Sequence, residues 1–163
     1  HFTHFLVYTR SHLAEQTTPA ALVFFDTRAL ASNLSFFDID GDRGDVAGTM
    51  KWLAPADTTH VMHYELYLGE DPLGAGRTHL GTVIAGVHEF FVPADTALAG
   101  RFTHLLVYAR SPLAEQTTPT SLALADTAAS VENVSFADYD LDLGDLGGVL
   151  AWTPPEDESQ VTR

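Results

Sequence analysis

The chain contains no cysteine and a single lysine, Lys51, among its 163 residues. Without thiols it can form neither a disulfide framework nor a thiolate metal site. Eight basic side chains stand against 22 acidic ones, which gives a formal net charge of −14. Such a surface repels phosphate backbones and anionic lipid, so we expect no nucleic-acid or membrane-surface partner. No apolar run is long enough for a bilayer span, so we expect no membrane insertion.

Signatures of catalysis are also missing. No serine, histidine and acidic residue fall into a recognisable hydrolase motif, and there is no glycine-rich phosphate loop. Carboxylates are abundant, but nothing in the pattern places one in an apolar pocket that would raise its pKa. The sequence therefore predicts that the protein is not an enzyme and, calcium apart, needs no cofactor.

What the chain does contain is an internal repeat. The segment "HFTHFLVYTRSHLAEQTTP" (1–19) returns as "RFTHLLVYARSPLAEQTTP" (101–119), and the correspondence continues to the last residue at an offset of 100. A period of 100 is too long for a solenoid unit and suits a self-contained domain in tandem. We expect a slice of a longer repetitive protein: the last strands of one unit (1–27), one complete unit (28–127) and the first strands of the next (128–163).

Strand signals fill the complete unit. Runs of threonine, valine, phenylalanine and tyrosine are separated by glycine, proline and aspartate, and no helical period is sustained. These runs predict a two-sheet β-sandwich, with "VPADTALAG" (92–100) as a corner connection. The seven predicted strands are 32–38, 45–54, 60–68, 77–84, 86–92, 101–110 and 116–125.

The first strand changes its apolar face midway. In "NVSFADYDLDLGD" (133–145), Val134 and Phe136 have one parity, while Tyr139 and the leucines after it have the other. Such a change predicts a bulge or bend near Ala137, with the aspartates of this segment facing outward.

Several segments resemble a known family. "WLAPADTTHVMHYELY" (52–67) and "WTPPEDESQV" (152–161) resemble the second and third strands of fibronectin type III domains, with a tryptophan, prolines and spaced tyrosines. "THLLVYARSPLAEQT" (103–117) resembles the sixth strand, its turn and the seventh strand. The repeats are also similar to tandem fibronectin-like modules of large surface proteins of microbes and algae. This resemblance implies a fibronectin III/immunoglobulin-like sandwich with spacer, adhesive or scaffold work.

Aspartates suggest a metal site between the first two strands. The two matching segments, "DIDGDRGD" (38–45) and "DYDLDLGD" (138–145), carry four aspartates each. Carboxylate oxygens are ligands that calcium prefers. The alternative is an acidic edge that resists pairing with another sheet. The candidate ligands are Asp38, Asp40, Asp42, Asp45, Asp138, Asp140, Asp142 and Asp145. The first copy also contains Arg-Gly-Asp at 43–45. We do not expect an adhesion ligand there, because Arg43 becomes Leu143 in the second copy.

Sugar attachment is predicted at matching positions of the repeat. Asn33-Leu-Ser35 and Asn133-Val-Ser135 are N-glycosylation sequons. Their alternative is a polar residue that begins a strand. O-linked sugar is predicted on the threonines of the two "EQTTP" segments, where an edge-strand proline is the alternative. These threonines are Thr17, Thr18, Thr117 and Thr118.

The face of the sixth strand opposite Leu105 and Val107, together with one face of the third strand, is predicted to form an interface. Exposed apolar and aromatic side chains of this kind mark contact surfaces, and a repeat array multiplies weak contacts. Its partner would be a neighbouring repeat, another copy of the chain, or a glycan. The alternative is an ordinary sandwich surface. The residues are His63, Tyr67, Phe102, His104, Leu106 and Tyr108.

These patterns together favour a structural module of an extracellular or cell-surface tandem-repeat protein. We expect a fibre or surface appendage, glycosylated and stiffened by calcium, whose end strands are completed by the parent chain or by strand donation from a neighbouring chain. The alternative function is an adhesive or carbohydrate-binding sandwich module of a secreted protein.

Overall fold

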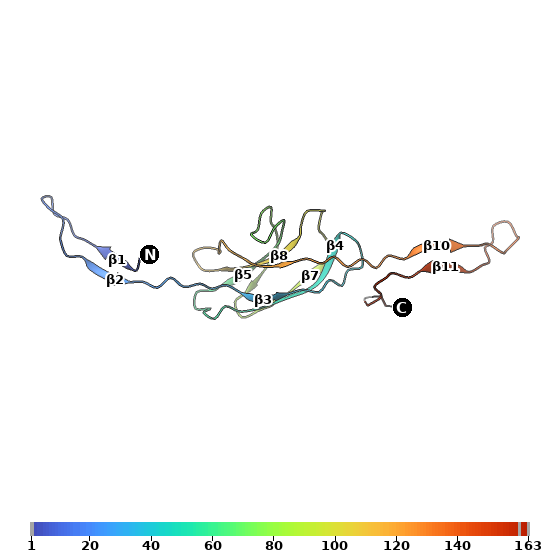
Figure 1. The fold of residues 1–163 in the computed structure, drawn as a ribbon, viewed down its shortest axis with the longest axis horizontal. Helices are drawn as coiled ribbons and strands as arrows, with labels where there is room; N and C mark the ends of the chain where they lie inside the picture. The colour runs from blue at the N-terminus through green and yellow to red at the C-terminus, as the bar shows by residue number, and fades with distance from the viewer. Residues whose placement is uncertain (1, 160, 163) are drawn as a thin grey trace.

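The computed structural model describes residues 2–159 and 161–162, which form three parts along an extended chain (Figure 1). A hairpin of β1 (His4–Val7) and β2 (Ala20–Val23) comes first. A central unit containing β3 to β9 follows, and a hairpin of β10 (Glu132–Phe136) and β11 (Leu150–Thr153) comes last. Within the described residues no helix has the length and apolar character needed to cross a membrane.

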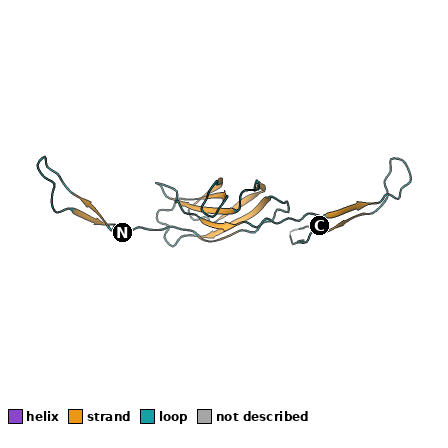
Figure 2. Cartoon of the chain, turned by 45° about the horizontal axis from the view of Figure 1, so that its top comes forward, coloured by secondary structure: helices purple, strands orange, loops and turns teal. Residues whose placement is uncertain are grey.

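Two antiparallel sheets make up the central unit (Figure 2). One sheet has the strand order β3-β4-β7, and the other has the order β6-β5-β8-β9. The prediction of an all-β protein with antiparallel sheets is confirmed. The strands are β3 (Ser32–Ser35), β4 (Asp45–Leu53), β5 (His63–Gly69), β6 (Thr78–Ile84), β7 (Glu89–Ala97), β8 (His104–Arg110) and β9 (Thr120–Ala123).

The two sheets pack against each other through alternate side chains. Successive residues of a strand point to opposite faces, so every second residue reaches the core. On β8 these are Leu105, Val107 and Ala109, as their parity in the sequence predicts. Burial of each large apolar side chain stabilises the fold by about 1.5–3 kcal/mol. The other sheet and β5 contribute Val46, Met50, Trp52, Val92, Tyr64, Leu66 and Leu68.

The sequence prediction differs most from the structure at the connection 92–100. All seven predicted strands are present within a few residues, but β7 runs on to Ala97 instead of ending at Val92. Val46 pairs with Thr96 and Asp45 with Ala97, beyond a register shift that follows Val46. Across this shift β7 has two more residues than β4, and extra residues at a bulge let a strand continue through a sequence typical of a turn.

The predicted bulge of the first strand exists but lies earlier than Ala137. The register shifts between Ser32 and Ser35 in β3, and between Glu132 and Ser135 in β10. The residue responsible is an asparagine in each copy, since Asn33 has a φ of 49° and Asn133 a φ of 51°. Asparagine tolerates this left-handed conformation better than most residues. The change of parity after Phe136 falls beyond the end of β10, in the following turn.

Strand registers recur 100 residues apart. In β1–β2, His4 lies opposite Val23, and in β8–β9, His104 lies opposite Ala123. The bulged pairing of β3 with β4 recurs in the same way between β10 and β11. Each outer hairpin is therefore a copy of one edge of the central unit without the remaining strands.

Candidate functional site

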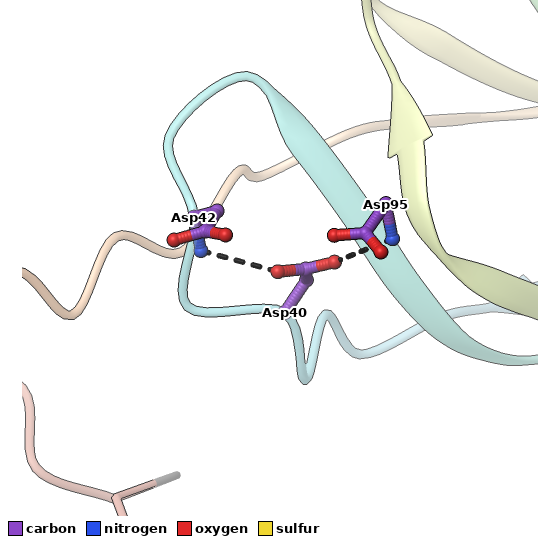
Figure 3. Close-up of side chains that lie close together, drawn as sticks. All are labelled: Asp40, Asp42 and Asp95. Atoms are coloured by element: carbon purple, nitrogen blue, oxygen red, sulfur yellow. Dashed lines mark hydrogen bonds between the residues drawn. The ribbon is translucent and has the colours of Figure 1, made fainter.

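The turn between β3 and β4, residues 36–44, is called the acidic turn below, and two of its carboxylates lie close to a third carboxylate from β7. Asp40, Asp42 and Asp95 each offer an oxygen, and these oxygens lie within 4.8 Å of one another (Figure 3). Two oxygens bound to one calcium ion at about 2.4 Å lie no more than about 4.8 Å apart. The spacing therefore fits a shared cation.

Hydrogen bonds already occupy both oxygens of Asp40. Its Oδ1 accepts from the Asp42 amide at 3.2 Å, and its Oδ2 accepts from the Asp95 amide at 2.9 Å. These bonds give the cluster a structural role, because they tie the acidic turn to β7. Calcium takes 6–8 oxygen ligands, and three carboxylates supply only part of that set. Calcium binding stays a prediction.

Asp38 was expected to face outward as a metal ligand, and the structure places it in the interior. It is only 3% exposed. Oδ1 accepts from the amides of Asp40 at 3.1 Å and Ala47 at 3.0 Å, while Oδ2 accepts from the amide of Thr127 at 2.9 Å. A carboxylate that accepts several amide hydrogen bonds stabilises the turn that supplies them. Asp38 is thus a structural residue that joins the acidic turn to the segment after β9.

The second copy of the acidic turn repeats these local bonds. Asp138 Oδ1 accepts from the amides of Asp140 and Gly147, each at 3.0 Å. Asp142 donates its amide to Asp140 as Asp42 does to Asp40. The remaining two predicted ligands, Asp45 and Asp145, donate their own amides to the carbonyl oxygens of Asp42 and Asp142. Among the described residues, only the first copy brings three carboxylates together.

Sequence reasoning missed Asp95 because it lies in the segment read as a corner connection. Only the pairing of β4 with the far end of β7 brings it to the acidic turn. Its φ of 59° places it in the left-handed region, where aspartate and asparagine are enriched among non-glycine residues. The one signal in the sequence that could have pointed to Asp95 was an aspartate in a segment with both strand and turn character.

The Arg-Gly-Asp tripeptide lies at the end of the acidic turn. Gly44 has a φ of 94°, and its amide donates to Asp126 Oδ2 at 2.9 Å. Asp45 is the first residue of β4. Arg43 lines a groove together with Glu132 and residues 153–156 of the next hairpin. The tripeptide is therefore part of a tight turn that faces the following segment of the chain.

Both N-glycosylation sequons are on the exposed side of a bulge. Asn33 and Asn133 are exposed, and their left-handed φ gives asparagine a conformational reason to be there even without sugar. The side-chain Nδ2 of Asn133 donates to Thr153 Oγ1 at 3.2 Å. Accessibility fits a sugar acceptor, and glycosylation stays a prediction.

The threonines predicted to carry O-linked sugar are exposed. Thr17 and Thr18 lie in the turn before β2, and Thr117 and Thr118 lie in the turn before β9. They precede an edge strand instead of lying within one, since β9 begins at Thr120. Their modification also stays a prediction.

Half of the predicted interface residues are buried. β5 and β8 are neighbours, as the prediction required, with Tyr67 opposite Leu106. Phe102 belongs to the core, however, and both Leu106 and Tyr108 are covered. The turn at 70–77 lies over them, with the Tyr108 hydroxyl donating to the Leu73 carbonyl at 3.3 Å. In the complete unit these three side chains cannot meet a partner.

His63, Tyr67 and His104 are half-buried, and Tyr67 is part of an internal network. Its hydroxyl donates to Glu115 Oε2 at 2.8 Å, and Arg77 contacts Glu115 Oε1 at 2.7 Å. The Arg77 guanidinium stacks on the rings of Tyr67 and Tyr108, at 4.3 and 4.4 Å. Burial, followed by the bond to Glu115, raises the pKa of Tyr67 to about 12.

Glu65 lies beside this network and forms hydrogen bonds to the neighbouring strand β6. It accepts hydrogen bonds from the Thr82 hydroxyl and from His79, whose Nε2 lies 3.0 Å from Glu65 Oε2. Burial opposes ionisation, but the bonds from Thr82 and His79 together outweigh it and hold the pKa of Glu65 below its usual value. The polar groups of this face bond to one another, which joins β5, β6 and the β8–β9 turn.

Comparison with known proteins gave no match: no family model, no curated protein and no solved structure matches the chain. Any function assigned to it has to come from its own residues and geometry.

Proposed function

We propose that the chain is a structural segment of an extracellular tandem-repeat protein, in which β-sandwich units of about 100 residues follow one another in a fibre or surface appendage. The observation that carries the proposal is the recurrence of strand registers at an offset of 100, from β1–β2 to β8–β9 and from β3–β4 to β10–β11. A closed unit between two partial copies is what a segment of such an array would contain.

Strand order supports the fibronectin type III-like part of the proposal. The sheets β3-β4-β7 and β6-β5-β8-β9 face each other over one core, with Trp52 buried in it. Sandwiches of this architecture commonly serve as surface and adhesion modules. The exposed sequons Asn33 and Asn133 support an extracellular, glycosylated protein, with calcium at the acidic turn as a further part of the proposal.

One observation favours an adhesive or carbohydrate-binding module as the second candidate. Phe37 is 60% exposed and Phe91 is 56% exposed, both on or next to the three-stranded sheet. Phe37 corresponds to Ala137 in the repeat, and a contact residue that varies between copies fits selective binding. Exposed aromatic rings are suited to stacking on a sugar.

Electron microscopy of the assembly isolated from its native source tests the proposal. We expect units repeating along a fibre, with branched density on Asn33 and Asn133. A peak ringed by the oxygens of Asp40, Asp42 and Asp95 at about 2.4 Å would add calcium. Isolated single modules with bare asparagines would overturn the fibre, and the binding module would then lead.

A further inference from the structure

The segment that leaves the complete unit is bound to the acidic turn. This segment, residues 124–131, joins β9 to β10. The Thr127 amide donates to the buried Asp38 carboxylate at 2.9 Å, and Asp126 accepts from the Gly44 amide at 2.9 Å. The Ala129 amide donates to the carbonyl of Gly41 at 2.8 Å. Residues 126–129 of the segment are therefore fixed to the unit that they follow.

The segment that enters the central unit is bound to that unit near the end of the segment. This segment, residues 24–31, joins β2 to β3. Gln116 Nε2 donates to the carbonyl of Ala29 at 2.7 Å, and the Thr120 hydroxyl donates to the carbonyl of Ala31. Ala31 is part of the core, and Ala29 packs against it. The second half is fixed to the unit that it enters.

The two segments are the same linker seen at two positions of the repeat. "FFDTRALA" (24–31) and "LADTAASV" (124–131) share Asp-Thr and the alanine two residues later, and neither contains glycine or proline. Ala129 donates its amide to the unit behind it, and its counterpart Ala29 offers its carbonyl to the unit ahead. A linker with a unit on each side would have both bonds on one residue.

We propose that successive units are locked together by this shared linker, which both neighbours bind, so that an array of them is a stiff rod. The inference rests on the proposed function, because it requires units in tandem. Flexible linkers are rich in glycine and serine, and their ends separate as a random coil. Here the anchors at residues 126, 127 and 129 overlap with those at 29 and 31, and no unbound stretch is left between them.

Charged side chains in the groove beside the linker also favour a fixed junction between the unit and the next hairpin. Arg43 of the acidic turn lines it with Glu132 and Glu156 of the following hairpin. The shared groove brings one positive charge near two negative ones, and this longer-range attraction favours the arrangement in which the hairpin lies next to the turn.

The chain as it exists tests the lock, because each linker copy has only one of its two neighbours. Backbone ¹⁵N relaxation of the full chain should show a crossed pattern. We expect Thr127 and Ala31 to be as rigid as strand residues, with order parameters of about 0.85. Their counterparts Thr27 and Val131 should be mobile, with order parameters below about 0.6. Equal mobility of Thr27 and Thr127 would overturn the lock.

Matched variants connect the rigidity to specific bonds. Asp38→Asn keeps an oxygen for the amides of Asp40 and Ala47 but turns an NH₂ group toward the Thr127 amide, so Thr127 should become mobile. Asp126→Ala, on the exposed linker itself, should loosen Thr127 without affecting the core. Asp42→Ala removes a carboxylate from the same turn that makes no bond to the linker, and it should leave Thr127 rigid. Rigidity at Thr127 in both Asp38→Asn and Asp126→Ala would overturn the proposal.

Failure of the lock and failure of the proposed function are distinguishable. A fibre seen by microscopy together with a mobile Thr127 would keep the array and reject the stiff linker. A rigid Thr127 in a protein that forms isolated modules would keep the junction and reject the fibre.

Discussion

The central unit and the outer hairpins place the same side chains in opposite environments. Trp52 is 3% exposed and its counterpart Trp152 is 53% exposed, although they occupy matching positions of the repeat. Tyr108 is 2% exposed and Tyr8 is 41% exposed. Pairing registers are nevertheless the same in the two contexts. Local sequence therefore sets the hairpin and its register, whereas burial requires the strands that only the complete unit supplies.

The two tryptophans give the largest expected difference. Trp52→Ala should destabilise the central unit by about 3–5 kcal/mol, because it removes a buried aromatic side chain and leaves a cavity. Trp152→Ala should leave the unfolding midpoint of the central unit unchanged. Urea unfolding followed by circular dichroism measures both. Equal effects would show that the last hairpin folds into a core that it shares with the unit.

The two copies of the acidic turn give the next largest difference. Asp38→Ala should destabilise the unit by about 1–3 kcal/mol, because it leaves buried amides without their acceptor. Asp138→Ala should not shift the midpoint, since the corresponding carboxylate is exposed and bonds only within its own turn. The same urea experiment applies. A destabilised Asp138→Ala variant would mean that the second turn is also packed.

Acid stability should depend on the Glu65 network of the central unit. The pKa of Glu65 is lower in the folded protein than its ordinary value of 4.5. Its ionised form thus stabilises the fold above pH 4.5, and this contribution is lost as the pH falls below 4.5 through the lower folded value. Glu65→Gln should flatten the decline of the thermal midpoint between about pH 5 and pH 3.

Glu89→Gln is the control for that measurement, because Glu89 is a largely exposed glutamate of the other sheet. It should leave the decline of the thermal midpoint as in the parent chain. An unchanged pH profile for Glu65→Gln would show that the network contributes nothing in acid.

The smallest expected effect is an increase in stability, and it tests whether burial of a tyrosine hydroxyl is favourable without a hydrogen bond. The buried Tyr64 hydroxyl has no hydrogen-bond partner among the described residues, and removing an unsatisfied group can be neutral or stabilising. Tyr64→Phe should therefore raise stability by up to about 1 kcal/mol. Tyr67→Phe is the matched comparison, and it should lower stability because it loses the bond to Glu115. Thermal unfolding of both variants decides the point.

Much of the fold was predictable because strand signals are local. Alternating apolar residues, with glycine, proline and aspartate between the runs, located all seven strands. The parity of Leu105 and Val107 identified the core face. The sequence prediction was wrong about the outward face of Leu106 and Tyr108, since the turn at 70–77 folds over them. Alternation tells which face a residue occupies and cannot tell what covers that face.

The candidate site was only partly predictable for a similar reason. The acidic turn was located, and Asp40 and Asp42 do lie together. Asp38 shares their spacing, but its side chain turns inward to amides that come from Ala47 and Thr127. Asp95 joins the cluster through strand pairing across 55 residues from Asp40. Contacts over such separations leave no local trace in a sequence.

The bond between Thr120 and the Ala31 carbonyl bears on how the protein is made. It joins the last strand of the unit to the residue just before the first strand, and the two residues are 89 positions apart. In the proposed array, a unit cannot close during synthesis until its last hairpin has emerged, and by then the preceding unit is complete. That order matters because β1–β2 and β8–β9 are nearly interchangeable, and neighbouring repeats misfold by exchanging equivalent strands. Vectorial synthesis would give each hairpin to its own unit, whereas refolding from denaturant would let the copies compete.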